Sequence, residues 1–351
     1  MKVAIIAPPW DKLPSRDYIG IGTTIYNLAE ELNQQGHHII LFAPFGSISS
    51  ADTILYPENR SGIDFENSSE QTRYYFKDLI SKYACSKAVS LGADIIHNFT
   101  LAGEFDNPVP CLHTLYQPPE NKIVNKCTEI SKNYGNYFVS VSNSQRALFE
   151  ETTPEINFID CVYKSIDIKN IKPGKDKESY FLYMGQIEQQ KSLELAKRVT
   201  EEAGKRLVAV IQGEKKQIYS EEIKPWLNRE TSSLNLQFPE ELPEEARYDL
   251  FRKAKGTFFV SRWEEPFGME MLESLACGTP VIALRKGAAS EVIIDGKTGY
   301  LVDTEKEMIN AVKNIGEINP AECRKHVAEN FSSQVISKKY LKIYKKIQKL
   351  F

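Results

Sequence analysis

Residues 262–273 read Arg-Trp-Glu-Glu-Pro-Phe-Gly-Met-Glu-Met-Leu-Glu, with glutamates at 265 and 273 on either side of a Pro-Phe-Gly turn. The preceding residues, 256–261, are mainly aromatic and β-branched, which is typical of a buried parallel strand. Residues 269–276 contain only side chains that a helix tolerates. The turn therefore leads from a strand into a helix, which is the repeating connection of an α/β fold.

This turn favours binding of a phosphorylated sugar. A helix that begins near Gly268 points its first unpaired amides, and the positive end of its dipole, at a phosphate above the strand. Gly268 has no side chain to block that approach. An ionised carboxylate only accepts hydrogen bonds, so Glu265 suits sugar hydroxyls and Glu273 suits the two adjacent hydroxyls of a ribose. The alternative is that both glutamates are ordinary solvated residues of a helix. The flanking turn and the apolar strand predicted at 281–284 favour a binding site over this alternative.

The stretch from Glu265 to Ala283 resembles the signature of the retaining glycosyltransferases of family 4. It contains Glu-Pro-Phe-Gly, a helix carrying Glu273, and then Ala-Cys-Gly-Thr-Pro-Val-Ile-Ala. The resemblance implies the GT-B fold, in which two Rossmann-like, doubly wound parallel-sheet domains face each other across a cleft and a C-terminal helix crosses back to the N-domain. Further residues that match the family pattern are Gly287, Glu291, Gly296 and Gly299.

Two elements of the first half extend the resemblance. A loop at 20–24, Gly-Ile-Gly-Thr-Thr, is similar to the family's glycine turn, although alone it would indicate only a turn before a helix. Val-Ser-Asn-Ser at 141–144 is similar to the family's Val-Ser-x-Ser element; it places Ser142 at the pocket and also forms an N-cap cluster. As donor-binding residues the resemblance implies Gly20, Gly22, Gly185, Gln186, Gly213, Phe267, Gly268, Met269, Glu270 and Glu273.

One departure from the family pattern opens the second half. Family members have Gly-Arg-x-x-x-x-Lys-Gly there, and the Arg and Lys neutralise the donor diphosphate. This chain keeps Gly185 and Lys191 but has Gln186 in place of the Arg. Loss of one of two cations in a dry site weakens transition-state stabilisation by an amount on the order of several kcal/mol. Nearby basic residues that offer a substitute are Lys215, Lys216 and Arg262.

The acceptor side of the family carries a His after a strand of the first domain, and two alignments are possible here. Leu-His-Thr at 112–114 matches one subgroup and makes His113 the catalytic His. Thr-Leu-Tyr at 114–116 matches another subgroup, with Tyr116 in place of its His. We prefer His113; the alternative is a His that only makes hydrogen bonds at a strand end. His97 resembles an earlier family His and is predicted to support the binding pocket.

The chain contains no Asp-x-Asp, the usual carboxylate pair that holds a divalent ion on the donor phosphates. We therefore predict a metal-independent reaction with no cofactor besides the nucleotide-sugar co-substrate. The predicted catalytic residues are His113, Glu265 and Lys191. Amides at 268–270 and Lys191 stabilise the departing diphosphate, and that diphosphate serves as the base for the acceptor hydroxyl.

Length and composition agree with this interpretation. A chain of 351 residues is long enough for two domains, each with its own core. The net charge of −3 gives no reason to expect nucleic-acid binding. Its 6 cysteines form no Cys-x-x-Cys pair, so neither disulfides nor a zinc site are indicated. Residues 1–9 carry too short an apolar run for a signal peptide, and no run is long enough to span a membrane. These features favour a cytoplasmic protein.

Alternating strand and helix patterns occur in two series, which predicts two parallel sheets with helices on both faces. The predicted domains are 1–167, an acceptor-binding domain, and 168–331, a nucleotide-sugar-binding domain. A segment rich in Lys, Pro, Gly and Asp, residues 168–179, links them. Expected strands of the first series are 3–7, 38–43, 94–97, 109–113 and 137–142; those of the second are 180–184, 207–211 and 256–261.

The C-terminal segment, residues 332–351, has a basic amphipathic pattern. Such a helix can lie on an anionic membrane, at the inner face in a cytoplasmic protein. The resemblance implies instead that it packs on the N-domain with its basic face in water, and we favour packing over weak peripheral membrane contact. Its apolar positions are Ile336, Tyr340, Ile343, Ile347 and Phe351, and the lysines opposite them are Lys338, Lys342, Lys345 and Lys349.

Together these features predict a retaining hexosyltransferase (EC 2.4 type) that moves a sugar from a UDP- or GDP-sugar to a hydroxyl of a glycan, a glycolipid or a small molecule, as in polysaccharide biosynthesis. Two alternatives stay open. The first is a sugar-nucleotide-binding partner subunit with little catalysis, which Gln186 and the ambiguous His suggest. The second is a GT-B sugar-nucleotide epimerase, against which the spacing of Glu265 and Glu273 argues.

Overall fold

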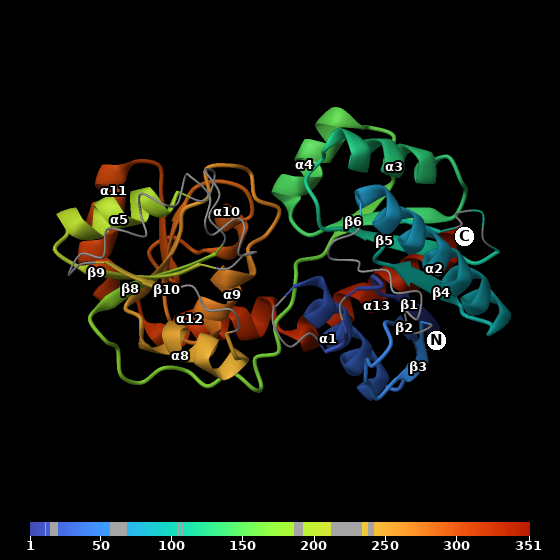
Figure 1. Cartoon of the computed structure of the whole chain (residues 1–351), viewed down its shortest axis with the longest axis horizontal. Helices are drawn as coiled ribbons and strands as arrows, with labels where there is room; N and C mark the ends of the chain where they lie inside the picture. Colours follow the sequence, from blue (N-terminus) through green and yellow to red (C-terminus); the bar gives the residue numbers. More distant parts are fainter. Residues whose placement is uncertain are drawn as a thin grey trace. The chain divides into compact units, whose positions relative to one another are not determined.

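The computed structural model describes residues 1–10, 12–14, 20–56, 69–103, 106, 108–185, 192–211, 234–237 and 242–351. The chain forms two compact units. The first comprises Met1–Ser165 together with Ser333–Phe351, and the second comprises Ile166–Ser332. Each unit is a parallel sheet with helices on both faces (Figure 1), which confirms the predicted doubly wound α/β class.

The sheet of the first unit has the strand order β3-β2-β1-β4-β5-β6-β7, with every pair parallel. The order changes direction between β1 and β4, which is the switch point of a doubly wound sheet. The strands are β1 (Lys2–Ile6), β2 (His38–Ala43), β3 (Asp52–Leu55), β4 (Ile95–Asn98), β5 (Cys111–Leu115), β6 (Asn136–Ser140) and β7 (Phe158–Cys161). The helices are α1 (Ile21–Gln34), α2 (Glu70–Ser90), α3 (Asn121–Ser131), α4 (Asn143–Thr152) and α13 (Ser333–Leu350).

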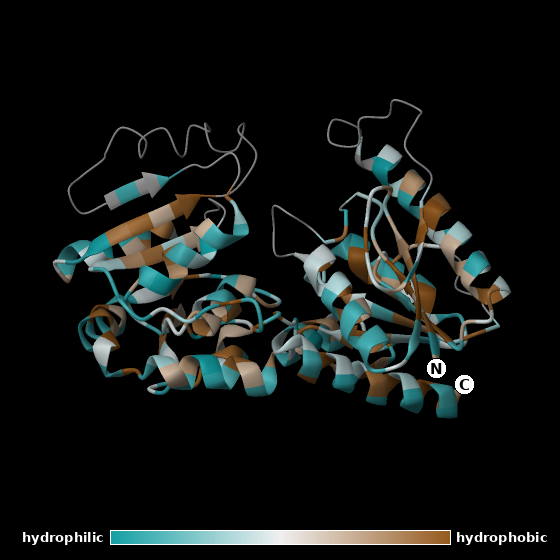
Figure 2. Cartoon of the chain, turned by 90° about the horizontal axis from the view of Figure 1, so that it is seen from below, coloured by the Kyte–Doolittle hydropathy of each residue, from teal (hydrophilic) through white to brown (hydrophobic). Residues whose placement is uncertain are grey.

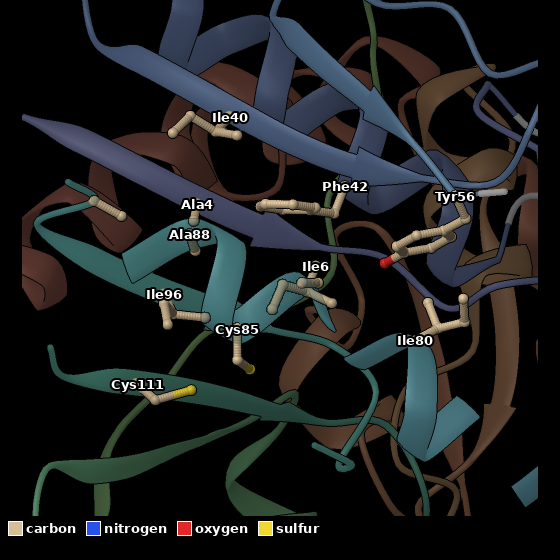
Figure 3. Packing of buried hydrophobic residues seen from close by; sticks show 12 residues of the cluster. Ala4, Ile6, Ile40, Phe42, Tyr56, Ile80, Cys85, Ala88, Ile96 and Cys111 are labelled. Atoms are coloured by element: carbon tan, nitrogen blue, oxygen red, sulfur yellow. The ribbon is translucent and has the colours of Figure 1, made fainter. Parts of the chain in front are cut away.

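A hydrophobic core lies between this sheet and α2 (Figure 3). Ile6 of β1 and Phe42 of β2 belong to the same cluster as Ala84 and Cys85 of α2. Side chains alternate between the two faces of a strand, so the residues next to these in each strand point to the other face of the sheet. Strands β1 and β2 are therefore mainly apolar, whereas the central strands β4 and β5 also carry buried polar side chains, among them His97 and His113.

The sheet of the second unit has the order β10-β9-β8-β11-β12-β13, again all parallel, with its switch point between β8 and β11. Helices α5 and α11 lie on one face and α8 and α12 on the other (Figure 1). The strands are β8 (Tyr180–Gly185), β9 (Arg206–Ile211), β10 (Leu234–Gln237), β11 (Gly256–Phe259), β12 (Val281–Leu284) and β13 (Gly299–Val302). The helices are α5 (Leu193–Glu202), α8 (Glu244–Lys253), α9 (Met269–Ala276), α10 (Ala289–Val292), α11 (Glu305–Asn314), the 3-10 helix η2 (Ile315–Glu317) and α12 (Pro320–Asn330).

The C-terminal helix α13 belongs to the first unit, as predicted. Hydrophilic and hydrophobic segments alternate along it (Figure 2). Its apolar positions Ile336, Tyr340, Ile343 and Ile347 are buried, so the apolar stripe is explained by packing on the first unit. The four lysines opposite the stripe are exposed, and so is Phe351, at 42%. Among the residues that the structure describes, no helix has the length and apolar character needed to cross a lipid bilayer.

Candidate functional site

The turn that connects β11 to α9 is built around Gly268. Its backbone has φ +95°, a conformation that favours glycine, and a Cβ at this position would collide with the ring of Phe259. Every residue of α9 is buried, because the helix packs against the sheet and against α12 and α8. The first turn of α9 is therefore held immediately after the end of β11. The amide of Met271 donates to the carbonyl oxygen of Gly268 at 3.4 Å, whereas the two amides before it have no partner within the helix.

A small pocket, open to solvent, lies at the switch point of the second sheet. Tyr183 and Met184 line it from the end of β8, and residues 258–261 line it from the end of β11. Two carboxylates, Glu265 and Glu270, complete its lining on either side of Gly268. In open α/β sheets, ligands bind outside the carboxyl ends of the strands at such a switch point. The pocket thus has the place and the polar groups of a binding site.

Glu265 is held by a second loop, which follows β12. The amide of Ala288 donates to the carbonyl oxygen of Glu265 at 3.1 Å, and the amide of Gly287 donates to Oε2 of Glu264 at 2.5 Å. A Cβ on Gly287 would lie 2.5 Å from both the backbone nitrogen and the backbone oxygen of Glu265. Only glycine allows this close approach, so the two loops form one rigid wall beside the pocket.

The second glutamate of the motif, Glu273, lies one turn further along α9 and is completely buried. Its two carboxylate oxygens accept from the guanidinium of Arg247 on α8: Nη2 lies 2.5 Å from Oε2, and Nε donates to Oε1. Burial raises the pKa of the Glu273 carboxyl, and the Arg247 charge opposes that rise. Glu273 does not line the pocket, so its predicted contact with a ribose stays a prediction. No local pattern in the sequence indicates Arg247, because nothing distinguishes it from other helical arginines.

His97, which the sequence predicts to support the binding pocket, lies in the core of the first unit. It is completely buried, and its ring nitrogens Nδ1 and Nε2 each lie 2.7 Å from a hydroxyl, that of Tyr344 and that of Thr114 respectively. The ring also packs on Phe99, with centroids 4.0 Å apart. Burial lowers the pKa of His97 well below its usual value, so the ring is neutral. Both polar atoms of the ring are used inside the protein, and His97 joins α13 to the sheet.

His113, the preferred candidate for the catalytic His, also lies in the core of the first unit. It lies in the middle of β5, is completely buried and packs on Phe138, and its Nε2 is 3.0 Å from Oδ1 of Asn136. Burial lowers the pKa of His113 to about 4. The other alignment fits the geometry better, because Tyr116 directly follows the carboxyl end of β5. The Tyr116 hydroxyl is buried and has no hydrogen-bond partner among the described residues, and Nζ of Lys164 lies 5.2 Å from the centre of its ring.

The remaining predicted residues of the first unit form helix starts. Gly20 is the N-cap of α1, so that Gly22 lies inside the first turn of the helix and not in a loop as predicted. Ser142 is completely buried, and its hydroxyl accepts from the amide of Gln145 at 3.1 Å. The predicted N-cap at Ser142 is therefore confirmed, and its hydroxyl caps α4.

Other predicted residues of the second unit lie close to the pocket or outside the described part. Gly185 is the last residue of β8. Phe267 and Met269 are buried, and Phe267 packs edge-on against Phe331, so they support the turn through packing. Gln186, Lys191 and Gly213 fall outside the described residues. Within the described ranges, no group of three or more His, Cys, Asp or Glu side chains is arranged to hold a metal ion.

Comparison with known proteins places these features in context. Residues 165–332 match the family model described as "Glycosyl transferases group 1". A probable sucrose-phosphate synthase of Thermosipho melanesiensis is 34% identical over 102 residues, which is 28% of this chain and 24% of that protein. The chain thus spans about a quarter of the length of this curated relative.

Two solved structures resemble the whole chain. The sucrose-phosphate synthase of Thermosynechococcus elongatus has a TM-score of 0.77 at 18% identity, and 100% of each chain is covered. The Anabaena protein HepE, solved in complex with UDP, has a TM-score of 0.70 at 13% identity, with 99% of this chain and 100% of HepE covered. At these identities the likeness shows the fold, which is the predicted GT-B arrangement of two Rossmann-like domains.

Proposed function

We propose that this chain, whose residues 165–332 match the family model of the glycosyl transferases of group 1, transfers a sugar from a nucleoside-diphosphate sugar to a hydroxyl acceptor. The observation that carries the proposal is the pocket at the switch point of the second sheet, where Glu265 and Glu270 flank the start of α9. A helix start with free amides suits a diphosphate, and carboxylates suit sugar hydroxyls. The complex of HepE with UDP supports a nucleoside diphosphate as the bound group.

Each part of the donor meets a group of matching chemistry in this proposal. The first amides of α9, together with Lys191, neutralise the diphosphate. Glu265 accepts hydrogen bonds from hydroxyls of the transferred sugar, and the wall formed with Gly287 keeps it in place. Glu273 accepts from the ribose hydroxyls. Donor contacts of this kind need no divalent ion, and we propose that the reaction proceeds without one.

The proposed chemical step is a substitution with retention at the anomeric carbon. The bond between that carbon and the diphosphate oxygen breaks, and the acceptor oxygen forms its bond on the same face of the sugar. The proton of the acceptor hydroxyl passes to the departing diphosphate, which acts as the base. The amides and Lys191 stabilise the negative charge that develops on the leaving oxygen, and preorganised donors of this kind are a large part of such catalysis.

Tyr116 replaces His113 in the proposal for the acceptor side. Tyr116 directly follows the end of β5 and has a buried hydroxyl, whereas His113 lies in the middle of β5 and is completely buried. A tyrosine hydroxyl both donates and accepts hydrogen bonds, so it suits a hydroxylated acceptor such as a glycan, a glycolipid or a small polyol.

Nucleotide binding followed by turnover tests the proposed function. We expect UDP- or GDP-sugars to raise the melting temperature, and slow release of free nucleoside diphosphate in the absence of acceptor. Glu273→Ala should weaken nucleotide binding, and it should also lower stability because it leaves the buried Arg247 guanidinium without its partner, so the melting temperature must show a folded variant before binding is measured. Glu245→Ala provides the control, because Glu245 is an exposed acid on α8. Full activity of a folded Glu273→Ala would remove Glu273 from the proposed donor site.

A partner subunit that binds a sugar nucleotide is the second candidate function. Gln186 in place of the family Arg removes a charge from the leaving-group site, and Tyr116 stands where one family subgroup has a His. Both changes weaken catalysis more directly than binding. Donor binding without any release of nucleoside diphosphate, over hours and with several acceptors, would favour this candidate over the enzyme.

A further inference from the structure

Arg247 and Glu273 form a buried ion pair between α8 and α9. Arg247 is 4% exposed and Glu273 is 0% exposed. Two N–H groups of the guanidinium donate to the two oxygens of one carboxylate, through Nη2 at 2.5 Å and through Nε. The guanidinium carbon also lies 5.9 Å from the centre of the Phe251 ring. The pair fixes the carboxylate in one orientation more strictly than a single hydrogen bond would.

Stability alone gives little reason for such a pair between two packed helices. Taking both charges out of water costs several kcal/mol per ion by general estimates, and an apolar pair of similar size is often as stable or more so. Phe251, whose ring lies beside the Arg247 guanidinium, and Leu272, next to Glu273 in the chain, are apolar and completely buried. An apolar contact would therefore fit this interface, and the charged pair calls for another reason.

We propose that Arg247 is a positioning residue of the nucleotide site, which holds the Glu273 carboxylate in the orientation that accepts the ribose hydroxyls of the donor. This inference rests on the proposed function. Each carboxylate oxygen has two lone-pair positions, and the two N–H groups of Arg247 occupy one on each oxygen. One position on each oxygen remains, which matches the two adjacent hydroxyls of a ribose. Arg247 acts through Glu273 and does not itself contact the donor.

The charge of Arg247 also keeps the carboxylate ionised. Burial raises the pKa of Glu273 and the guanidinium opposes the rise. Without Arg247 the buried acid takes up a proton more readily, and a protonated carboxyl is a poorer acceptor for two hydroxyls. Binding in a variant that lacks Arg247 should therefore become tighter as the pH is raised, because deprotonation restores the acceptor.

A titration that compares a ribonucleotide with its deoxy analogue tests the inference. Isothermal titration would measure the Kd of UDP, GDP and their 2′-deoxy forms for the wild type, Arg247→Met and Arg247→Lys. We expect the wild type to prefer the ribonucleotide by about tenfold, the scale of one lost hydrogen bond to a charged group. In Arg247→Met this preference should fall to nearly one, and in Arg247→Lys, which keeps the charge without the fork, to an intermediate value.

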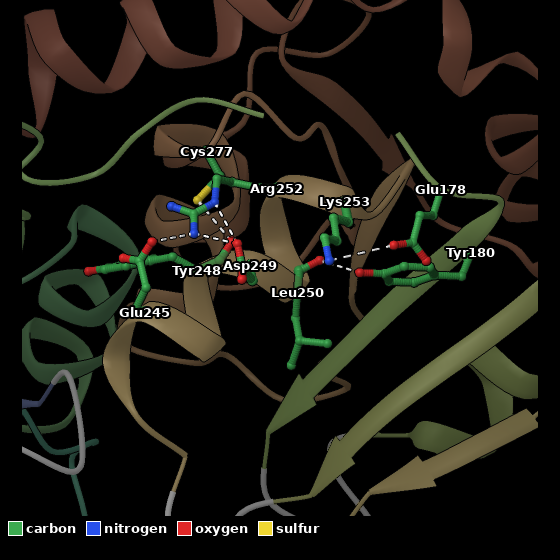
Figure 4. A network of polar contacts seen from close by, with 9 residues as sticks. All are labelled: Glu178, Tyr180, Glu245, Tyr248, Asp249, Leu250, Arg252, Lys253 and Cys277. Carbon is green, nitrogen blue, oxygen red and sulfur yellow. Dashed lines mark hydrogen bonds and ion pairs between the residues drawn. The ribbon is translucent and has the colours of Figure 1, made fainter. Parts of the chain in front are cut away.

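Arg252→Met is the matched control (Figure 4). Arg252 lies on the same helix, and its guanidinium pairs with Glu245 at 2.7 Å and with Asp249, away from Glu273. We expect it to lower stability slightly and to leave the ribose preference at the wild-type value. Circular dichroism and melting temperature would show which variants are folded before any titration.

The outcomes separate this inference from the proposed function. A wild type that binds neither nucleotide overturns the proposed function and the inference together. A wild type that binds both nucleotides without preferring ribose overturns the role of Glu273 and this inference, and leaves the pocket intact. A folded Arg247→Met with the wild-type preference overturns the positioning role alone. If Arg247→Met does not fold, a wild-type preference in Arg247→Lys overturns it in the same way.

Discussion

The hydroxyl of Tyr344 lies 2.7 Å from Nδ1 of His97, and this contact joins the last helix of the chain to the carboxyl end of β4. On the other side of the ring, Nε2 lies 2.7 Å from the hydroxyl of Thr114, which in turn is 3.2 Å from the hydroxyl of Tyr340. All four side chains are buried. A helix that begins more than 230 residues after His97 is therefore part of the core of the first unit.

Tyr344→Phe should destabilise the protein by about 1–3 kcal/mol, because it leaves a buried ring nitrogen of His97 without its hydrogen bond. Urea denaturation monitored by circular dichroism measures the change. Tyr134→Phe is the control, since its hydroxyl also donates to α13, at the Leu350 carbonyl, but the side chain is 71% exposed. We expect less than about 0.5 kcal/mol there. Equal losses in the two variants would show that burial of the His97 contact has no special weight.

Acid should destabilise the protein through its buried histidines. The folded-state pKa of His113 is lowered to about 4 by burial, against a usual value of 6.5, and Lys126 contributes in the same direction. Between these values the unfolded chain binds a proton that the folded chain does not, so stability is fully present above pH 6.5 and is lost as the pH falls toward 4. The pKa difference corresponds to about 3 kcal/mol. The pKa of His97 is also lowered, which adds to the loss.

His113→Gln checks this prediction, because glutamine does not titrate and can still donate to Asn136. Denaturation at a series of pH values from 7 to 4.5 should give a shallower slope for the variant than for the wild type. The slope should not vanish, since His97 remains. Parallel slopes would mean that His113 does not control the loss of stability in acid.

The architecture was predictable to the extent that it depends on local patterns. Strands such as β2 and β9 are buried on both faces and so appear as continuous apolar runs in the sequence. The edge strands β3 and β7 were missed because they are partly exposed and carry mixed side chains. The start of α9 was predicted because the Gly268 turn has a strong local signature, and it does lie beside the pocket.

The side chains that long-range contacts define could not be predicted in the same way. His97 is enclosed by residues of β5 and α13, and Arg247 meets Glu273 across 26 positions of sequence. Neither partner can be read from neighbouring residues. His113 was preferred because its residue type matches the family, but the end of β5 falls at Leu115 and leaves Tyr116 at the edge of the sheet. A small shift in the predicted end of a strand therefore changes which residue is expected to lie beyond it.

Turnover should be unchanged when a chelator such as EDTA is added. The chain lacks an Asp-x-Asp pair for a divalent ion on the donor phosphates, and the proposed site uses helix amides and Lys191 instead. Initial rates with and without EDTA, and after addition of Mg²⁺ or Mn²⁺, measure the effect. Loss of activity that either metal restores would contradict the prediction and would place an ion at the leaving group.

Gly287→Ala should weaken donor binding because the new Cβ cannot fit against Glu265. It would lie 2.5 Å from the backbone nitrogen and oxygen of Glu265, and the backbone at Gly287 has φ +53°. The loop that carries Glu265 must then move, and we expect about a tenfold weaker Kd for the donor, because a misplaced contact loses much of its value. Backbone strain adds a stability loss of about 1–3 kcal/mol.

Gly296→Ala is the control for Gly287→Ala, because it has the same kind of backbone strain without the steric clash. Gly296 has φ +71°, so alanine is strained there as well, but a Cβ would meet nothing within 4 Å. Both variants should lose stability through backbone strain, Gly287→Ala should lose more because of the added clash, and only Gly287→Ala should lose donor affinity. Because Gly296 shares the backbone conformation and not the contact, equal affinities in the two variants would show that the fit between Gly287 and the Glu265 loop does not control the donor site.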